Sequence, residues 1–254
     1  MTSSLLQIDR LTKRFGGVVA ADAICLDIPP GEFHAVIGPN GAGKTTLVGL
    51  LAGEIVPQEG AIRFEQSDIT RLPVYRRSRL GLARSFQISS LFSDFTALEN
   101  VALATQAHRG HSFRFWRDAR REAALRKPAQ AALARVGLGA RAHVRVDRMS
   151  HGERRKREIA MALATAPRML LLDEPMAGMG PEESAQMVER LRQLKGTMTI
   201  LLIEHDMDAV FALADRITVL VYGRVIASGR PAAIKADAAV RQAYLGEKES
   251  SSHG

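Results

Sequence analysis

Three short and almost wholly apolar runs stand out along the chain, at residues 32–37, 169–173 and 199–204. Strands buried on both faces of a sheet have this continuous pattern, because neither side of the strand meets water. Apolar positions at helical spacing predict helices over residues 44–52, 182–194 and 207–214. This alternation predicts an α/β fold with a parallel sheet that is covered by helices on both faces.

The remaining pattern predicts two additions to this core. Near the N-terminus, turns rather than helices separate the strands, which predicts an antiparallel β subdomain with strands at residues 5–10, 24–28 and 61–64. The middle of the chain has helical spacing and predicts a helical insertion, with helices over residues 97–107, 117–136 and 153–166. We expect Pro128 to interrupt the second of these helices. A last strand is expected over residues 217–222.

The composition of the 254 residues is that of a globular protein with a sizeable core. No apolar run approaches the roughly 20 residues that a membrane-spanning helix needs. The first residues lack the charged and apolar regions of a secretory signal. The single cysteine, Cys25, fits a reducing cytoplasm, and we interpret it as a small strand residue.

The net charge of +8 is concentrated between residues 109 and 157, where fifteen Lys and Arg residues outnumber four Asp and Glu residues. Such a segment can contact nucleic acid, an anionic membrane or an acidic partner, or it can be a solvated helical surface. Its aromatic residues are Phe113, Phe115 and Trp116, which are few for base stacking. We therefore expect no nucleic-acid ligand.

Residues 38–45 form a complete phosphate-binding loop, between the strand that ends at residue 37 and the helix that begins at residue 44. Glycines allow consecutive backbone N–H groups to face an anion, and the helix N-terminus adds a positive dipole end. Lys44 would reach the β and γ phosphates, and the Thr45 hydroxyl would hold Mg²⁺. A simple glycine turn would not explain this lysine and threonine. The expected nucleotide-binding residues are Gly38, Pro39, Asn40, Gly41, Ala42, Gly43, Lys44, Thr45 and Thr46.

Two carboxylates, Asp173 and Glu174, directly follow the apolar run at residues 169–172. Open α/β sheets bind their ligands at the carboxyl ends of the strands, which is where this pattern places both acids. Asp173 would contact Mg²⁺, and Glu174 would act on the attacking water as general base or as the group that orients it. Without the phosphate loop upstream, the pair would be interpreted as a surface turn.

A third segment, Ser150 to Glu153, precedes the helix expected at residues 153–166. Serine followed three residues later by glutamate is a capping box, which is a structural role. The serine, Gly152 and the helix N-terminus also form a second possible anion site. One nucleotide cannot easily use both this site and the phosphate loop of the same chain. The segment therefore favours a site that closes on the nucleotide of a neighbouring subunit.

These segments together resemble the ATP-binding-cassette (ABC) ATPase subunits. The family's motifs occur in order and at approximate spacing, at residues 38–46, Gln87, 149–153, 170–175 and His205. The resemblance covers residues 5–246 and implies a single ABC ATPase domain over residues 1–246. Within it we expect the nucleotide core and β subdomain at about 1–87 and 168–246, and a helical subdomain at about 88–167. Residues 247–254 are polar and are expected to be a disordered tail.

The resemblance implies a dimer in which two cassettes hold two ATP molecules between them, head to tail. Ser150, Gly152 and Glu153 of one cassette would face the phosphate loop of the other. The catalytic residues would then be Lys44, Glu174 and His205, with His205 in contact with the γ-phosphate.

The resemblance also assigns roles to two residues that the pattern alone does not single out. Phe15 would stack on adenine, and Gln87 would join Mg²⁺ and the attacking water to the helical insertion. The implied Mg²⁺ ligands are thus Thr45, Gln87 and Asp173. Taken singly, Phe15 is interpreted as a core aromatic, Gln87 as a surface residue and His205 as a loop residue; only their joint placement favours the functional roles.

The sequence departs from the family pattern in three places. His151 stands where a glycine is commoner, and residues 175–180 lack an aspartate that many members carry. The missing aspartate weakens any expectation of coupling between subunits through this loop. The residue expected to stack on adenine, Phe15, is a phenylalanine where tyrosine is also found, and stacking needs only the ring.

Within the family, the chain resembles the ATPases of branched-chain amino-acid (Liv-type) importers, at residues 150–155, 174–183 and 243–246. The extended segment at 106–127 resembles the larger of the two partner ATPases in such systems. The implied partners are a second ABC ATPase subunit, as homo- or heterodimer, transmembrane permease subunits and, indirectly, a periplasmic solute-binding protein. The permease would contact residues 88–111. The expected location is peripheral, on the cytoplasmic face of the inner membrane.

Other functions stay open from the sequence. ATPases for urea, short amides, aromatic acids or lipopolysaccharide export resemble this chain closely. A soluble cassette that acts on ribosomes or nucleic acid is a second class, supported only by the basic segment. A regulatory module that binds ATP without hydrolysis is a third, and the presence of Glu174 and His205 argues against it.

Overall fold

The computed structural model describes residues 4–85, 92–109 and 123–243. The chain divides into two compact units. Unit 1 contains the described residues up to Arg77 together with residues 171–174 and 195–243. Unit 2 contains the described residues from Ser78 to Leu170 together with residues 175–194.

The first sheet of unit 1 is antiparallel, as the sequence predicted, and has the order β2-β1-β4-β5. Its strands are β1 (Leu6–Phe15), β2 (Val18–Ile28), β4 (Glu59–Phe64) and β5 (Ser67–Asp68). The first two strands are longer than predicted, because β1 and β2 continue as a hairpin until Phe15 pairs with Val18. The end of this hairpin is mostly exposed and its register is irregular, so its sequence lacks the strict alternation on which a sequence-based prediction relies.

The second sheet contains the strands that the apolar runs predicted, in the order β10-β9-β3-β8-β7 within unit 1. Its strands are β3 (Phe33–Ile37), β7 (Met169–Asp173), β8 (Thr199–Ile203), β9 (Arg216–Val221) and β10 (Arg224–Gly229). Every residue of β3, β7 and β8 is buried. β3 is parallel to both β8 and β9, which confirms the predicted parallel sheet and places the carboxyl ends of these strands at one edge.

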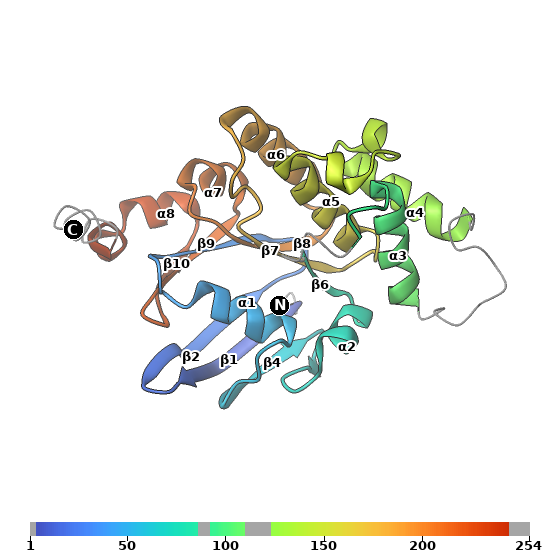
Figure 1. Cartoon of the computed structure of the whole chain (residues 1–254). Helices are drawn as coiled ribbons and strands as arrows, with labels where there is room; N and C mark the ends of the chain where they lie inside the picture. Colours follow the sequence, from blue (N-terminus) through green and yellow to red (C-terminus); the bar gives the residue numbers. More distant parts are fainter. Residues whose placement is uncertain (1–3, 86–91, 110–122, 244–254) are drawn as a thin grey trace. The chain divides into compact units, whose positions relative to one another are not determined.

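Helices lie on both faces of this sheet in unit 1. Helices α7 (Met207–Leu213) and α8 (Pro231–Ala236) cover one face, where Val210 and Ile234 pack against residues of β3 and β9. Helix α1 (Lys44–Ala52) lies on the other side, between the two sheets (Figure 1). Helix α2 (Val74–Arg79) begins in unit 1 and has one buried residue, Arg77.

Unit 2 is mainly helical. Helices α3 (Ala97–Arg109), α4 (Ala123–Arg135) and α5 (His151–Leu163) pack against one another, and α6 (Pro181–Leu194) buries three apolar residues. Two 3₁₀ turns, η2 (Gly139–Arg141) and η3 (Val146–Arg148), lead to the start of α5. The short strand β6 (Leu82–Arg84) runs beside the start of β7, where the Met169 N–H donates to the Gly81 carbonyl oxygen at 3.0 Å.

The predicted interruption at Pro128 is wrong, because α4 continues through this proline. A proline removes its own N–H from the helix ladder, and its ring crowds the carbonyl group four residues earlier, but it need not end the helix. The buried Ala129, Ala132 and Leu133 on the next turns keep the helix packed in unit 2. Sequence analysis also missed α2, β6, β10 and α8, which are all short. No helix among the described residues combines the length and apolar composition needed to span a bilayer.

Candidate functional site

The phosphate-binding loop is packed so closely against its neighbours that two of its glycines have no room for a side chain. A Cβ atom at Gly38 would lie 2.0 Å from the Leu220 carbonyl oxygen, and one at Gly43 would lie 2.1 Å from the Ala20 carbonyl oxygen. Gly41 and Gly43 have φ angles of 77° and 99°, which glycine adopts without strain. The loop is therefore a cradle of backbone groups, and this geometry suits an anionic phosphate chain.

Lys44 lies across this loop. Its ammonium group donates hydrogen bonds to the carbonyl oxygens of Gly38 at 2.6 Å and Pro39 at 2.9 Å, and the side chain is buried. Thr45, the second residue of α1, is exposed, and Thr46 is partly exposed. A cation together with backbone N–H groups and a hydroxyl at a helix N-terminus is the set of groups that binds phosphates with their metal ion.

The tip of the β1–β2 hairpin belongs to the same neighbourhood through Ala20. This residue of β2 lies against Gly43 and also against Gly223 in the β9–β10 turn, whose N–H donates to the Ala42 carbonyl oxygen at 2.9 Å. Phe15, near the end of the hairpin, is 49% exposed, and the Lys13 ammonium lies 5.2 Å from its ring centroid. Phe15 is thus not a core aromatic, and its ring is available for stacking on a ligand.

Asp173 and Glu174 lie at the carboxyl end of β7. Asp173 is buried, whereas the side chain of Glu174 is partly exposed. The Glu174 N–H donates to the Ile203 carbonyl oxygen at 2.9 Å, which joins the ends of β7 and β8. Glu174 has a φ angle of 46°, a left-handed conformation that is uncommon for residues other than glycine, asparagine and aspartate. Strain of this kind is found at sites where a side chain must be held in one direction.

His205 follows β8 and lies next to Glu174. Its Nδ1 atom is 3.9 Å from Glu174 Oε1 and 3.8 Å from Glu204 Oε2, and its side chain is 67% exposed. Glu204 is a buried acid that sequence analysis did not select. A signal was present, because Glu204 ends an apolar strand just as Asp173 does.

The Ser150 segment in unit 2 forms the capping box that the sequence predicted. Ser150 is the N-cap of α5: its Oγ accepts from the Glu153 N–H at 3.1 Å, and the Ser150 N–H donates to Glu153 Oε2 at 3.0 Å. Arg141 adds two hydrogen bonds to the Glu153 carboxylate, at 2.8 Å and 3.2 Å. The Arg141 hydrogen bonds hold the pKa of Glu153 below its ordinary value.

Helix α6 brings a second carboxylate to this helix end. Glu183 Oε1 is 3.5 Å from Ser150 Oγ, and a Cβ atom at Gly152 would lie 2.7 Å from Glu183 Oε2. The exposed His151 ring lies against Gly178, where an added Cβ would be 3.2 Å from the ring. His151 therefore lies beside the loop at residues 175–180, which lacks the family's aspartate, so two of the departures from the family pattern are neighbours in the fold.

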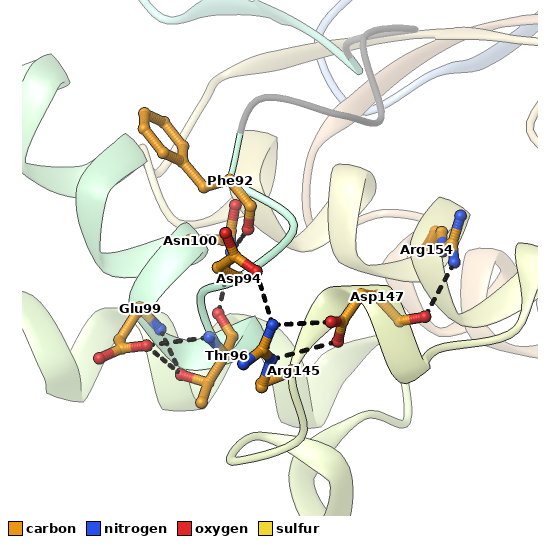
Figure 2. Close-up of polar contacts among 8 residues, drawn as sticks. All are labelled: Phe92, Asp94, Thr96, Glu99, Asn100, Arg145, Asp147 and Arg154. Carbon is orange, nitrogen blue, oxygen red and sulfur yellow. Dashed lines mark hydrogen bonds and ion pairs between the residues drawn. The ribbon is translucent and has the colours of Figure 1, made fainter.

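The segment that precedes α3 is joined to the turn that precedes α5. Val146 N–H donates to the Phe95 carbonyl oxygen and Asp147 N–H to the Ser93 carbonyl oxygen, each at 3.0 Å. The Arg145 guanidinium bridges the carboxylates of Asp94 and Asp147 (Figure 2). The approach to Ser150 is thus held in place within unit 2.

The structure accordingly gathers the predicted residues in two groups. Unit 1 contains Phe15, the loop residues 38–46, Asp173, Glu174 and His205, and unit 2 contains Ser150, Gly152 and Glu153. Gln87 lies outside the described residues. Among the described residues, no three His, Cys, Asp or Glu side chains form a ready metal cage. Mg²⁺ takes one or two protein oxygen ligands together with phosphate oxygens and water, and the exposed Thr45 hydroxyl beside the phosphate loop is an oxygen ligand of this kind.

The family model for "ABC transporter" matches residues 21–177, which is more than half of the chain. The chain belongs to the ABC transporter family. A second model, for the branched-chain amino acid ATP-binding cassette transporter, matches residues 224–250. The resemblance to this family and to its Liv-type ATPases is therefore confirmed.

Relatives of this ABC ATPase cover almost its entire length. The high-affinity branched-chain amino acid transport ATP-binding protein BraF of Pseudomonas aeruginosa is 37% identical, over 97% of this chain and 100% of BraF. LivG of Escherichia coli, with the same description, is also 37% identical, over 97% of this chain and 100% of LivG.

Solved cassettes share the fold. The ADP conformation of MJ1267, an ATP-binding cassette of an ABC transporter, superposes with a TM-score of 0.86 and 29% identity, over 96% of this chain and 100% of that one. The predicted cassette fold is confirmed, and the chain is an ATPase whose hydrolysis of ATP is coupled to transport.

Proposed function

We propose that this ABC ATPase powers the uptake of branched-chain or related amino acids. The observation that carries this proposal is the match of residues 224–250 to the branched-chain amino acid cassette model, at the end of a chain that resembles BraF and LivG throughout. A cassette does not contact the cargo, so this inference depends on similarity rather than on a pocket in this chain.

ATP would bind in unit 1, with its phosphates on the loop that follows β3 and its base on Phe15. Lys44 would leave its two carbonyl partners for the β and γ phosphates, and the N–H groups at the start of α1 would face the same oxygens. Mg²⁺, held by Thr45, Asp173 and Gln87, would neutralise charge on the phosphates. Stabilisation of that charge is the largest contribution that such a site makes to the rate.

Glu174 would orient the attacking water and accept its proton. The left-handed backbone at Glu174 and its hydrogen bond to Ile203 fix the point from which this side chain extends. His205, 3.9 Å away, would contact the γ-phosphate from the end of the neighbouring strand. Two side chains on adjacent strand ends can thus act together on the same transferred group.

The Ser150 segment would complete the site of a second cassette. Ser150 and Gly152 of the partner subunit would approach the γ-phosphate, and the dimer would close only when ATP is bound. Closure that depends on ATP makes binding energy available to move a permease, and hydrolysis resets the dimer. The second cassette is either a copy of this chain or a related subunit.

The permease subunits would contact residues 88–111, and within the described part of this segment Phe92 is exposed. The ATPase would sit on the cytoplasmic face of the inner membrane, bound to permeases that receive cargo from a periplasmic solute-binding protein.

A pull-down tests this assembly. Tagged Glu174→Gln protein, loaded with ATP, is captured from native membranes, and Lys44→Ala protein serves as the control that should not close on ATP. We expect two multispanning permeases and a second ATPase with the Glu174→Gln bait. Ribosomal proteins or nucleic acid in place of a permease would contradict the transport assignment.

A further inference from the structure

Glu204 is a buried acid at the edge of the sheet that carries the hydrolysis residues. The five residues before it, Thr199–Ile203, are all buried in β8, and Glu204 itself is only 1% exposed. Burial of a carboxylate is costly unless hydrogen bonds satisfy it. The hydrogen bonds that this buried carboxylate accepts therefore explain why it is found at this edge.

The carboxylate holds the backbone of the next two residues. Glu204 Oε2 accepts a hydrogen bond from the His205 N–H at 3.0 Å and a longer one from the Asp206 N–H at 3.4 Å. Asp206 is in turn the N-cap of α7, since its Oδ1 accepts from the Asp208 and Ala209 N–H groups at 3.0 Å and 3.1 Å. The backbone of His205 is thus fixed between the end of β8 and the start of α7.

This anchoring matters because the imidazole of His205 is mostly exposed and has little packing to direct it. With the backbone held, the Nδ1 atom lies 3.8 Å from Glu204 Oε2 and 3.9 Å from Glu174 Oε1. The His205 imidazole therefore lies near both the buried Glu204 carboxylate and Glu174, the proposed general base.

We propose that Glu204 is a positioning residue for ATP hydrolysis: its buried carboxylate fixes the His205 backbone so that the imidazole faces Glu174 and the γ-phosphate. The proposal rests on the roles proposed above for His205 and Glu174. Glu204 acts through hydrogen-bond acceptance, so an uncharged acceptor of the same reach should replace it. It acts through His205, so it should have no effect once the imidazole is absent.

Three substitutions separate these properties. Glu204→Gln keeps an oxygen acceptor at the same reach, Glu204→Asp keeps the charge but withdraws the acceptor by one methylene, and Glu204→Met keeps the volume without an acceptor. The matched control is Glu32→Gln. Glu32 also pairs with a histidine, His34, at 2.7 Å, and its carbonyl oxygen accepts from Ile200 N–H, so it lies by the opposite end of β8.

The measurements are the ATPase kcat and KM of the full chain, with melting temperature as a check of folding. We expect Glu204→Gln and Glu32→Gln to keep kcat within about threefold of the parent, and Glu204→Asp and Glu204→Met to lower it by about tenfold or more, with KM nearly unchanged. If Glu204→Met does not fold, a higher kcat for Glu204→Gln than for Glu204→Asp is enough to support the proposal. A kcat for Glu204→Asp equal to that of the parent, together with a lowered kcat for Glu204→Gln, would overturn the proposal.

A double-mutant cycle tests whether Glu204 acts through His205. In a His205→Ala background, Glu204→Asp should lower kcat no further, because the group it positions is gone. Additive losses would mean a general structural role and would overturn the proposal. If His205→Ala itself leaves kcat unchanged, or the parent does not hydrolyse ATP, the assignment of His205 or the proposed function fails instead.

Discussion

The Nδ1 atom of His205 lies 3.9 Å from the Oε1 atom of Glu174, across the ends of two neighbouring strands. Each residue is held by its backbone: Glu174 by its hydrogen bond to Ile203, and His205 by its hydrogen bond to Glu204. The two side chains proposed to act at the γ-phosphate therefore both extend from backbone that hydrogen bonds hold in place.

Replacing Glu174 by Gln should stop hydrolysis without preventing ATP binding. The amide cannot accept the proton of the attacking water, so we expect kcat to fall by roughly 10²–10⁴. Because the phosphate loop is unchanged, ATP should trap a closed dimer, visible by size-exclusion chromatography with light scattering. Turnover at the parental rate would remove Glu174 from this role.

Gly43→Ala should damage the phosphate loop, whereas Gly17→Ala should not. The new Cβ at residue 43 would lie 2.1 Å from a backbone oxygen, which cannot move without distorting its strand. The φ angle of 99° at this position would also strain an alanine. We expect a loss of about 2 kcal/mol or more in the free energy of unfolding, with weaker ATP binding. No atom lies within 4 Å of a Cβ at Gly17, so that control should stay within about 0.5 kcal/mol in urea unfolding.

Arg141→Met should raise the pKa of Glu153. The Arg141 hydrogen bonds depress this pKa, so the native pairing stabilises the fold fully above the ordinary glutamate pKa and is lost as pH falls through the lower native value. The difference in stability between the parent and Arg141→Met should therefore shrink on acidification through that window.

Carboxyl NMR of Glu153 and urea unfolding at several pH values check this expectation. Arg148→Met, an exposed arginine in the same segment, is the control and should leave the Glu153 titration unchanged. An equal Glu153 pKa in the parent and Arg141→Met would contradict the pairing.

Arg77→Met should destabilise unit 1 far more than Arg76→Met. The buried Arg77 guanidinium donates to four carbonyl oxygens, those of Leu50, Leu51, Thr70 and Leu72, at 2.7–2.9 Å. Burial lowers its pKa to about 10, so it stays charged at neutral pH. Methionine would leave all four carbonyl oxygens, two of them at the end of α1, without these donors, at a cost of roughly 3–5 kcal/mol in the free energy of unfolding. Arg76 is exposed, and calorimetry should show little change for it.

The strand ends that carry the proposed catalytic residues could be predicted from the sequence. β3 and β7 were recognisable because each is almost wholly apolar and is followed by a glycine loop or ends at a pair of acids. The capping box was recognisable because both of its members lie within four residues of one another.

Contacts between distant residues were beyond the reach of sequence patterns. Arg141 pairs with Glu153 across twelve positions, and Arg77 bonds carbonyl groups up to 27 positions away, so no local periodicity marks either residue. The contact of His151 with Gly178 shows the same limit. Each departure was visible in the sequence, but only the fold shows that the two touch.

The most direct test of the account is leucine uptake by proteoliposomes that contain this ATPase, its second ATPase, the permeases that it binds and their solute-binding protein. We expect ATP-dependent accumulation of leucine that is abolished when Glu174→Gln replaces the parent chain. Permease-stimulated ATP hydrolysis without uptake of leucine, isoleucine or valine would contradict the assignment of branched-chain amino acids as cargo.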